Sequence, residues 1–366
     1  MIVLQGKLYK KYIFSGVKVE RSFEQQGVFP GETVAYKVSV TNMKLLPLTW
    51  LNIDEAVPIQ LEFLDDDRVD KLDDASNNHQ LIYSVLPYQR VNRRYQVKCH
   101  KRGYYELRDI TMTSTNLLGS ENYEQSREVF TPLAVYPNLR EVGDDFIPAN
   151  TMLGDFSVNR WIMDDPMMIV GIREYQSSDS FKSINWKLTA KNQKLLVNKY
   201  DYTADKKIMM LVNLDKSEYS MEVQEVELME AALEVGASIA VKLIESGIPT
   251  GLATNAICIG EKASGLVEPD TGEDHIGNIL TVFSQISYMK KLQSRELLKL
   301  LIKDFSWGTE IIVITLTPTD SLMEDLEELG DIKTTVLAFK QADIKHIPRN
   351  VSLYFYDRGG EKYEAV

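Results

Sequence analysis

The chain has 366 residues, of which 44% are hydrophobic and 26% are charged, and its formal net charge is −12 at pH 7. This length allows two ordinary globular domains, and the acidic balance argues against a general nucleic-acid binder, which needs a basic surface. Cys99 and Cys258 lack CxxC spacing, so we expect neither a zinc site nor a disulfide framework, and a reducing compartment fits. There is no run of about 18 apolar residues, so we expect no transmembrane helix within this sequence.

The N-terminal part has the two-residue period of β-strands. Apolar side chains occupy every second position in 34–40 and again in 95–99. Further strand-like runs lie at 17–23, 81–86, 103–112 and 128–136. Segment 42–50, which contains Pro47, is expected to link the second and third strands. Seven or so short strands without a helical period predict an immunoglobulin-like β-sandwich, to which we assign residues 1–140.

From residue 194 to the end, strand patterns alternate with helix patterns. Continuous apolar runs predict strands that are covered on both faces, and three- and four-residue spacings predict helices. The predicted strands lie at 194–200, 207–214, 251–256, 310–317, 334–339 and 351–357, and the helices at 221–246, 276–287, 295–305 and 321–329. Gly247 and Pro249 are expected to end the first helix. Residues 194–366 are therefore predicted to form an α/β domain with a mostly parallel sheet and helices on both faces.

Residues 141–193 are predicted to connect the two domains. Segment 138–165 is rich in Gly, Pro, Asn and Asp, and we expect it to be partly ordered through Phe146, Met152, Phe156 and Trp161. The second half, GIREYQSSDSFKSINWKLTAK at 171–191, is dense in charged and aromatic residues. We call residues 171–191 the signature segment.

The signature segment has two interpretations. Its candidate residues are Arg173, Glu174, Tyr175, Asp179, Lys182, Asn185, Trp186, Lys187 and Lys191. In the first, Asp179 and Glu174 satisfy buried Arg and Trp donors, and the segment docks one domain on the other. In the second, the Arg, Trp and Tyr side chains are anchors of a surface that recognises another protein. We favour the domain-docking interpretation for Asp179 and Trp186, and the protein-recognition interpretation for the lysines.

A candidate metal site follows the first buried strand of the α/β domain, because ligands bind beyond the carboxyl ends of parallel strands. Asp215 and Ser217 resemble the first loop of the metal-ion-dependent adhesion site of von Willebrand factor A domains, where Asp-x-Ser-x-Ser holds a divalent ion. The fifth position is Tyr219 instead of Ser. Thr271 and Asp320 are the candidate distant ligands, and magnesium is the ion that such oxygen donors suit. In the alternative interpretation no metal binds and Asp215 caps the following helix.

Sequence motifs of enzymes are missing. There is no GxSxG, HExxH, P-loop or GxGxxG motif, and none of the four histidines lies beside a Ser or Cys in a catalytic arrangement. His275 opens a predicted helix near the candidate metal site, where a capping or surface role is the simpler interpretation. We therefore expect no enzyme activity and no cofactor other than the magnesium ion of the alternative.

The signature segment resembles a bacterial family known as domain of unknown function 58. The matching residues are Gly171-Ile172-Arg173-Glu174-Tyr175, Asp179, Lys182, Ile184, Trp186 and Thr189-Ala190-Lys191. Ser178 and Lys182 depart from the family pattern, which has Gly and Arg at these positions. The resemblance also extends through 28–32, 41–51, 101–119 and 135–139.

The resemblance implies a β-sandwich followed by a von Willebrand factor A-like, Rossmann-like domain. Family members commonly carry an N-terminal transmembrane hairpin, and this chain begins about where such a hairpin would end. Lys7, Lys10 and Lys11 would then lie near the membrane surface, with both termini on the cytoplasmic side. Family genes often accompany MoxR-type AAA ATPases. The expected function is a non-enzymatic adaptor that works with such an ATPase on membrane or envelope clients, and the alternative is a divalent-metal-dependent, adhesion-type ligand-binding domain.

Overall fold

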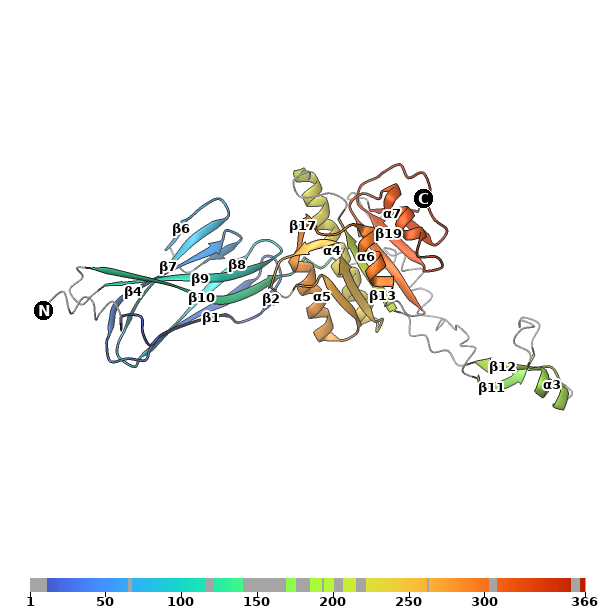
Figure 1. Cartoon of the computed structure of the whole chain (residues 1–366), viewed down its shortest axis with the longest axis horizontal. Helices are drawn as coiled ribbons and strands as arrows, with labels where there is room; N and C mark the ends of the chain where they lie inside the picture. The colour runs from blue at the N-terminus through green and yellow to red at the C-terminus, as the bar shows by residue number, and fades with distance from the viewer. Residues whose placement is uncertain are drawn as a thin grey trace.

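The computed structural model contains two folded parts, and each has its own hydrophobic core (Figure 1). It describes residues 12–64, 68–115, 121–140, 169–175, 185–192, 194–200, 207–214, 222–261, 263–302, 308–356 and 363–365. The connection predicted through Phe146, Met152, Phe156 and Trp161 lies outside these residues. Within the described ranges, no helix is long and apolar enough to cross a membrane.

The N-terminal part is a β-sandwich of two mainly antiparallel sheets. Its strands are β1 (Val17–Phe23), β2 (Gly27–Val28), β3 (Thr33–Asn42), β4 (Leu48–Pro58), β5 (Leu61–Phe63), β6 (Val69–Lys71), β7 (Ser76–Val85), β8 (Arg90–Cys99), β9 (Gly103–Thr115) and β10 (Asn122–Val135). One sheet has the order β1–β3–β8–β5, and the other has the order β2–β10–β9–β4–β7–β6. Every strand run predicted in this part overlaps one of these strands, so the strand-rich sandwich is confirmed.

Strand β4 was not predicted, although it lies between β7 and β9 in the second sheet. Its inward side chains include Leu51, Ile53, Glu55 and Val57, all of which are buried. A charged residue therefore occupies one of the core positions, and a bulge interrupts the register between Leu48 and Leu51. Both features hide the apolar alternation on which the prediction of a strand depends.

Four polar side chains form a network between the two sheets. The Glu55 carboxylate accepts hydrogen bonds from Arg21 Nη1 (2.7 Å) and Tyr36 Oη (2.7 Å), and it lies 2.8 Å from His79 Nδ1. Burial alone would raise the pKa of Glu55, but the hydrogen bond with His79 and the charge of Arg21 outweigh it and lower the pKa. The sandwich core therefore holds a carboxylate that is stable only with its partners in place.

The second part is built on a seven-stranded sheet. Its strands are β13 (Lys207–Asn213), β14 (Thr250–Thr254), β16 (Leu266–Asp270), β18 (Thr309–Thr315), β19 (Thr334–Ala338), β20 (Val351–Tyr356) and β21 (Tyr363–Ala365). Their order is β16–β14–β13–β18–β19–β20–β21. The inner five strands are parallel, and the two edge strands are antiparallel to their neighbours.

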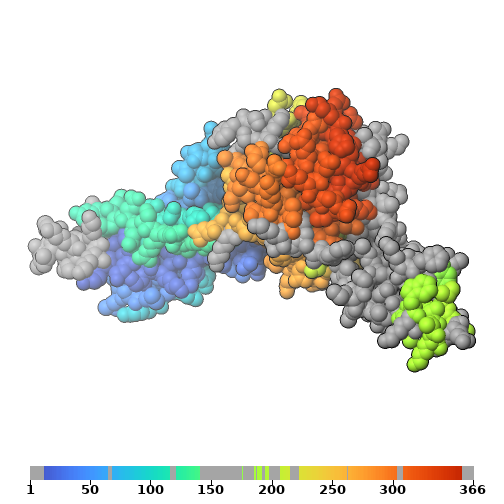
Figure 2. Space-filling view, turned by 45° about the vertical axis from the view of Figure 1, so that its right-hand side comes forward, coloured from blue at the N-terminus to red at the C-terminus, as the bar shows by residue number. Residues whose placement is uncertain are grey.

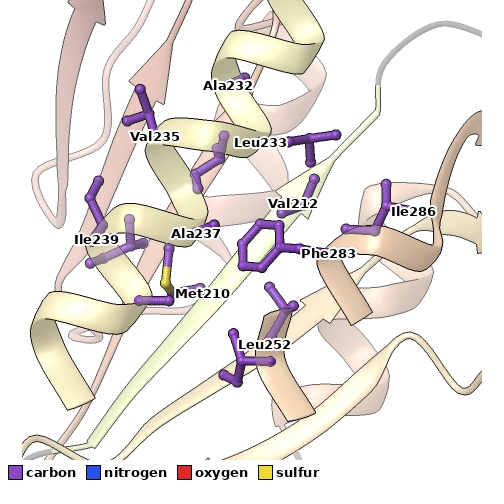
Figure 3. Packing of buried hydrophobic residues seen from close by; sticks show 14 of the residues in the cluster. Met210, Val212, Ala232, Leu233, Val235, Ala237, Ile239, Leu252, Phe283 and Ile286 are labelled. Atoms are coloured by element: carbon purple, nitrogen blue, oxygen red, sulfur yellow. The ribbon is translucent and has the colours of Figure 1, made fainter. Parts of the chain in front are cut away.

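Helices cover both faces of this sheet. They are α4 (Val223–Glu245), α5 (Glu273–Gln285), α6 (Ser294–Leu301) and α7 (Asp320–Glu327). Alternate residues of β13 point to opposite faces: Met210 and Val212 pack with α4 and α5, as Figure 3 shows, whereas Met209 and Leu211 pack with α6 and α7. A mostly parallel sheet between two helical layers agrees with the prediction, except that the strand predicted at 194–200 is not part of this sheet.

Helix α4 is the central helix of this domain. A capping box between Glu222 and Glu225 opens it. Gly247, with φ +81°, follows its last turn as predicted, because a left-handed residue there suits glycine. Gly236 lies where a Cβ would approach Ile314 Cδ1 to 2.4 Å, so the missing side chain lets α4 lie close to β18.

Three short strands of this part were not predicted. Edge strand β16 is half-exposed and contains Pro269, so it lacks a buried apolar run. Strand β21 adds three residues at the other edge of the sheet. Strand β17 (Ile286–Lys290) pairs with β15 (Ala256–Cys258) and directly follows α5, whose predicted end extended to residue 287. Without a turn residue between α5 and β17, the apolar pattern alone does not mark the change.

Candidate functional site

The signature segment contributes to a small unit of two strands and one helix. Strand β11 (Ile169–Glu174) pairs with β12 (Leu196–Tyr200), and α3 (Trp186–Asn192) lies between them in sequence. Asn185 Oδ1 accepts a hydrogen bond from Leu188 N (3.1 Å), which caps the start of α3. Leu196 N donates to Thr189 Oγ1 (3.0 Å) and thereby ties α3 to β12. The segment is thus more regular than its polar sequence indicates.

Trp186 is the most informative side chain of this unit, because 64% of its surface is exposed. A buried bracing role, which suited Trp186 in the first interpretation, does not agree with that exposure. Lys191 is also exposed, and Tyr175 is half-buried. Arg173, Glu174 and Lys187 are placed only by their backbone in β11 and α3, whereas Asp179 and Lys182 lie outside the described residues.

The sandwich is fastened to the second domain by Arg102, which lies outside the signature segment. Its Nε and Nη2 atoms donate to the Glu230 carboxylate of α4 at 2.6 to 3.0 Å. Nη1 donates to the carbonyl oxygens of Phe283 (2.8 Å) and Ile286 (2.9 Å) at the carboxyl end of α5. A cation suits the end of a helix that presents unpaired carbonyls. Tyr288 Oη also donates to Glu230.

The Arg102 side chain is almost completely buried, with 6% of its surface exposed. Burial favours a lower pKa for Arg102, but the hydrogen bonds and charge of Glu230 outweigh it and raise the pKa. Burial and then the charge of Glu230 raise the pKa of Tyr288. Both groups therefore keep the protonation state that this interface needs.

A second arginine extends the interface by one helical turn. Arg140 Nε donates to Glu234 Oε2 (2.8 Å), and its backbone N–H donates to Ser238 Oγ (2.9 Å). Glu230 and Glu234 lie four residues apart on α4, so they form an acidic stripe. The stripe faces two arginines, which gives the interface complementary charge.

The carboxyl edge of the parallel sheet has the topology of a binding site. Numbered along the chain, the five parallel strands have the order 2-1-3-4-5, with β13 first and β18 third. The chain passes from β13 to β14 on one side and from β18 to β19 on the other, so a crevice is expected between the carboxyl ends of β13 and β18. Asp215 and Ser217 follow the end of β13 in sequence, but they lie outside the described residues.

Two buried asparagines hold the end of β13. Asn255 Nδ2 donates to Asn213 Oδ1 (2.8 Å), and Asn255 Oδ1 accepts from Leu214 N (2.7 Å). Both asparagines are completely buried. At the same edge, Lys340 Nζ lies 3.0 Å from Glu225 Oε1 in the first turn of α4. These contacts fix the carboxyl end of β13 and the first turn of α4.

The predicted distant ligands lie at opposite edges of the sheet. Asp320 opens α7 beyond the carboxyl end of β18, and its carboxylate accepts from Lys345 N (3.0 Å). Thr271 directly follows Asp270, which pairs with Thr250, the first residue of β14. Thr271 therefore lies at the amino edge, and the structure does not bring it together with Asp320. In the described part of the chain, no three His, Cys, Asp or Glu side chains gather as metal ligands would.

His275 is neither a surface nor a metal-site residue in this arrangement. It is buried, and its Nε2 lies 2.7 Å from the carbonyl oxygen of Thr250. This contact joins the first turn of α5 to the amino end of β14, on the edge opposite the candidate site.

Asn213, Asn255 and Arg102 are not among the residues predicted from the sequence. A polar residue near the end of the predicted strand 251–256 is the signal that marks Asn255. Arg102 lies in segment 101–119, which carries part of the family resemblance. Neither signal identifies a partner, because Arg102 and Glu230 are 128 positions apart.

By its fold, the chain is a strand-rich protein with an N-terminal β-sandwich and a second, parallel-sheet domain. The family model described as "Protein of unknown function DUF58" matches residues 171–307, from the signature segment through α6. This match confirms the family resemblance over that range. The uncharacterized protein YeaD of Bacillus subtilis (strain 168) is 20% identical over 343 residues, which cover 93% of this chain and 80% of YeaD.

Solved structures are similar to part of the chain. The CARDB domain of the PF1109 protein from Pyrococcus furiosus is 12% identical and covers 32% of this chain and 96% of its own, with a TM-score of 0.20. The sporulation control protein Spo0M from Bacillus subtilis is 14% identical and covers 44% of this chain and 58% of its own, with a TM-score of 0.19. TM-scores this low support no functional argument.

Proposed function

We propose that this chain is a non-enzymatic interaction module that works with a MoxR-type AAA ATPase on membrane or envelope clients, on the cytoplasmic side. The observation that carries the proposal is the exposed indole of Trp186 on a capped helix. Tryptophan is enriched among the residues that dominate binding at protein interfaces. The signature segment is then the recognition surface, with Lys191 exposed on the same helix.

The size of the unit supports this role. A two-stranded sheet is at best marginally stable by itself, so β11, β12 and α3 gain stability when a partner covers their apolar side chains. Leu195 is exposed beside β12, and Trp186 begins α3. Both side chains are therefore available to a partner surface. Arg102 joins the sandwich to the second domain. The signature segment is therefore not needed to hold the two domains together.

Direct binding tests the proposal. A purified MoxR-type AAA ATPase from the host of this chain is titrated with the full chain, with and without ATP. We expect Trp186→Ala to weaken binding by about tenfold or more, since a buried Trp anchor contributes about 2 kcal/mol or more. Trp50→Ala, which removes another exposed indole, should bind like the wild type.

Circular dichroism should show that both variants fold. If the wild type binds no ATPase in either nucleotide state, the partnership is wrong. If Trp186→Ala and Trp50→Ala bind equally well, the ATPase uses a surface other than the signature segment.

We also propose a fold class for each domain. The sandwich is immunoglobulin-like, and the second domain is von Willebrand factor A-like and Rossmann-like. Numbered along the chain with the antiparallel edge strand β16 as the third strand, the seven-stranded sheet has the order 3-2-1-4-5-6-7, which supports the latter. In this class, the carboxyl edge beyond β13 is the binding edge.

The second candidate function is divalent-metal-dependent ligand binding at that edge. The Asn213–Asn255 pair favours it, because it fixes the chain immediately before Asp215 at the switch point of the sheet. Asp215, Ser217 and Asp320 would supply oxygen donors for Mg²⁺. Titration calorimetry with MgCl₂ and MnCl₂ should then show heat that Asp215→Ala and Asp320→Ala abolish. Thr271→Ala is the matched control, because Thr271 lies at the amino edge. Absence of heat from the wild type would contradict metal binding.

A further inference from the structure

In the described part of the chain, one edge of the β-sandwich has no partner strand. Strand β8 pairs with β3 on one side, from Arg90 to Lys98. On its other side, β5 pairs only with Val97–Cys99, and Leu64 N donates to Gln96 O (2.9 Å). Residues 90–94 of β8 therefore have no neighbouring strand on that side among the described residues. We call residues 90–94 the open edge.

The open edge presents backbone hydrogen-bonding groups to its surroundings. Alternate residues of a strand direct their N–H and C=O groups to opposite sides. Gln96 directs its carbonyl toward the β5 side, where it accepts the bond from Leu64. The register between β3 and β8 has no bulge, so Asn92 and Arg94 face the same side as Gln96. Each of these two residues offers one donor and one acceptor to an added strand.

Other edges of the sandwich are shortened or bridged. The edge strands β5 and β6 have three residues each. On the opposite side of the sandwich, Arg127 of β10 donates to Val17 O, and Arg21 of β1 donates to Val129 O, so side chains join these two strands. Natural sheets blunt their edges because a long free edge pairs with other chains. Within the described residues, the open edge has neither a bridge nor a covering strand, so it is available to a partner.

Arg93 is a charged residue that points inward from the open edge. It alternates with Val91 and the buried Tyr95, and its guanidinium carbon lies 4.5 Å from the centroid of the Tyr83 ring in β7. No carboxylate of the described residues forms an ion pair with Arg93. An inward charge at an edge disfavours the addition of an ordinary apolar strand. A strand that brings a carboxylate to this position instead gains a charge-assisted hydrogen bond.

The open edge lies away from the interdomain contacts. Arg93 precedes Cys99 by six residues of continuous strand, which is a distance of about 20 Å. Only beyond Cys99 does the chain reach Arg102 and its contacts with α4 and α5. Figure 1 and Figure 2 show the sandwich extending from the second domain as an arm. A partner segment can therefore pair with the open edge without displacing Arg102.

We propose that the open edge binds an extended, acidic peptide segment of a partner protein by strand addition. The backbone of the segment pairs with Asn92 and Arg94. Directly opposite residues of neighbouring strands point to the same face, so the segment has Glu or Asp opposite Arg93 and apolar residues opposite Val91 and Tyr95. The recognised pattern is therefore apolar-x-acidic-x-apolar. This proposal is independent of Trp186, of an ATPase and of a metal ion.

Nuclear magnetic resonance of the isotope-labelled full chain tests the proposal. The probe is the acetylated and amidated peptide Thr-Val-Thr-Glu-Thr-Val-Thr, and the comparison peptide has Lys in place of Glu. We expect the Glu peptide to shift the amide signals of Asn92 and Arg94 and to slow their hydrogen exchange. The Lys peptide should bind about tenfold more weakly or less, because it replaces a charge-assisted hydrogen bond with repulsion.

Two variants of the chain separate charge from backbone pairing. Arg93→Glu should reverse the preference, so that the Lys peptide binds better than the Glu peptide. Arg94→Glu is the matched control, because its side chain is exposed on the outer face, and it should retain the preference for Glu at physiological salt. Asn92→Pro removes an outward N–H that β3 does not use, so it should abolish binding, whereas Asn92→Ala should bind like the wild type.

Circular dichroism should show that all four variants fold. Absence of any change at the amides of β8 at millimolar Glu peptide would overturn the proposal. Equal binding of the two peptides, or an unchanged preference in Arg93→Glu, would show that Arg93 does not select the segment. Binding by Asn92→Pro at the wild-type level would show that the peptide does not pair with the open edge.

Discussion

Glu55 is a buried carboxylate in the core of an apolar sandwich, and it is stable there only because hydrogen-bond donors surround it. Arg21, Tyr36 and His79 surround it. The pKa of Glu55 is lowered from its ordinary value of 4.5, even though burial opposes this. The unfolded chain therefore takes up a proton at Glu55 more readily than the folded chain does. The contribution of Glu55 to the free energy of unfolding is present above the pKa that Glu55 has in the unfolded chain. This contribution is lost as the pH falls through the pKa that Glu55 has in the folded chain.

Replacing Glu55 tests this account. Glu55→Gln leaves the Arg21 guanidinium buried without its counter-charge, so we expect a loss of about 3–5 kcal/mol of unfolding free energy at neutral pH. The variant should also lose less stability than the wild type between neutral pH and the acidic side of pH 4.5, the ordinary value for Glu55. Urea denaturation followed at several pH values measures both effects.

Glu62→Gln is the control for this variant. Glu62 pairs with His100 at the surface of the same sandwich, where more than half of its side chain is exposed. An exposed pair contributes about 0–1 kcal/mol, so little change is expected. A Glu55→Gln variant as stable as Glu62→Gln would show that the buried network does not stabilise the fold.

At the scale of elements, α4 contributes residues both to the carboxyl edge of the parallel sheet and to the interface between the two domains. Its first turn lies at the carboxyl edge, where Glu225 contacts Lys340, and its middle carries Glu230 and Glu234 to the interdomain interface. Close packing of α4 on β18 depends on Gly236, because a side chain there would meet Ile314 and Phe283. The position of this helix therefore affects both surfaces.

Two glycine substitutions separate packing from helix propensity. Gly236→Ala gains about 1 kcal/mol of helix propensity but forces Ile314 to move, and overpacking of this kind costs about 1–3 kcal/mol. We expect a net loss of stability. Gly277→Ala in α5 meets no atom within 4 Å, so the same change should stabilise by about 0.5–1 kcal/mol. Thermal and urea denaturation measure both, and a stabilising Gly236→Ala would contradict the packing account.

At the scale of the whole molecule, one arginine fastens two cores to each other. Arg102 spans from the sandwich to α4 and α5, and Arg140 adds a second contact one turn further along α4. A buried pair that loses one partner leaves the other charge without compensation. The orientation of the sandwich relative to the second domain therefore depends strongly on Arg102.

Removing Arg102 should uncouple the two parts. We expect Arg102→Ala to increase the radius of gyration in small-angle X-ray scattering and to separate calorimetric unfolding into two transitions. Arg102→Lys should rescue only partly, because an ammonium group cannot bond Glu230 and two helix-end carbonyls as a guanidinium does. Arg94→Ala, which removes an exposed pair with Glu24, should behave like the wild type. One unchanged transition in Arg102→Ala would show that the other interdomain contacts, such as those of Arg140, join the parts without Arg102.

Much of the local structure follows from the sequence by itself. The two-residue period of β3 and β8, the apolar runs of β13 and β18 and the glycine stop of α4 are properties of neighbouring residues. The signature segment identifies the resemblance to a family in the same way, from consecutive residues. None of these signals requires knowledge of which strands pair.

Only the tertiary structure decided the features of this protein that depend on contacts between residues far apart in the sequence. Strand β4 is stable with Glu55 inside it because Arg21 and His79 come from other strands. The pairing of Asp270 with Thr250 places Thr271 away from Asp320, and no local pattern contains that register. The contacts of Arg102 with Glu230 and of Asn42 with Leu86 likewise join segments far apart in sequence, so the energy of these contacts exists only in the folded chain.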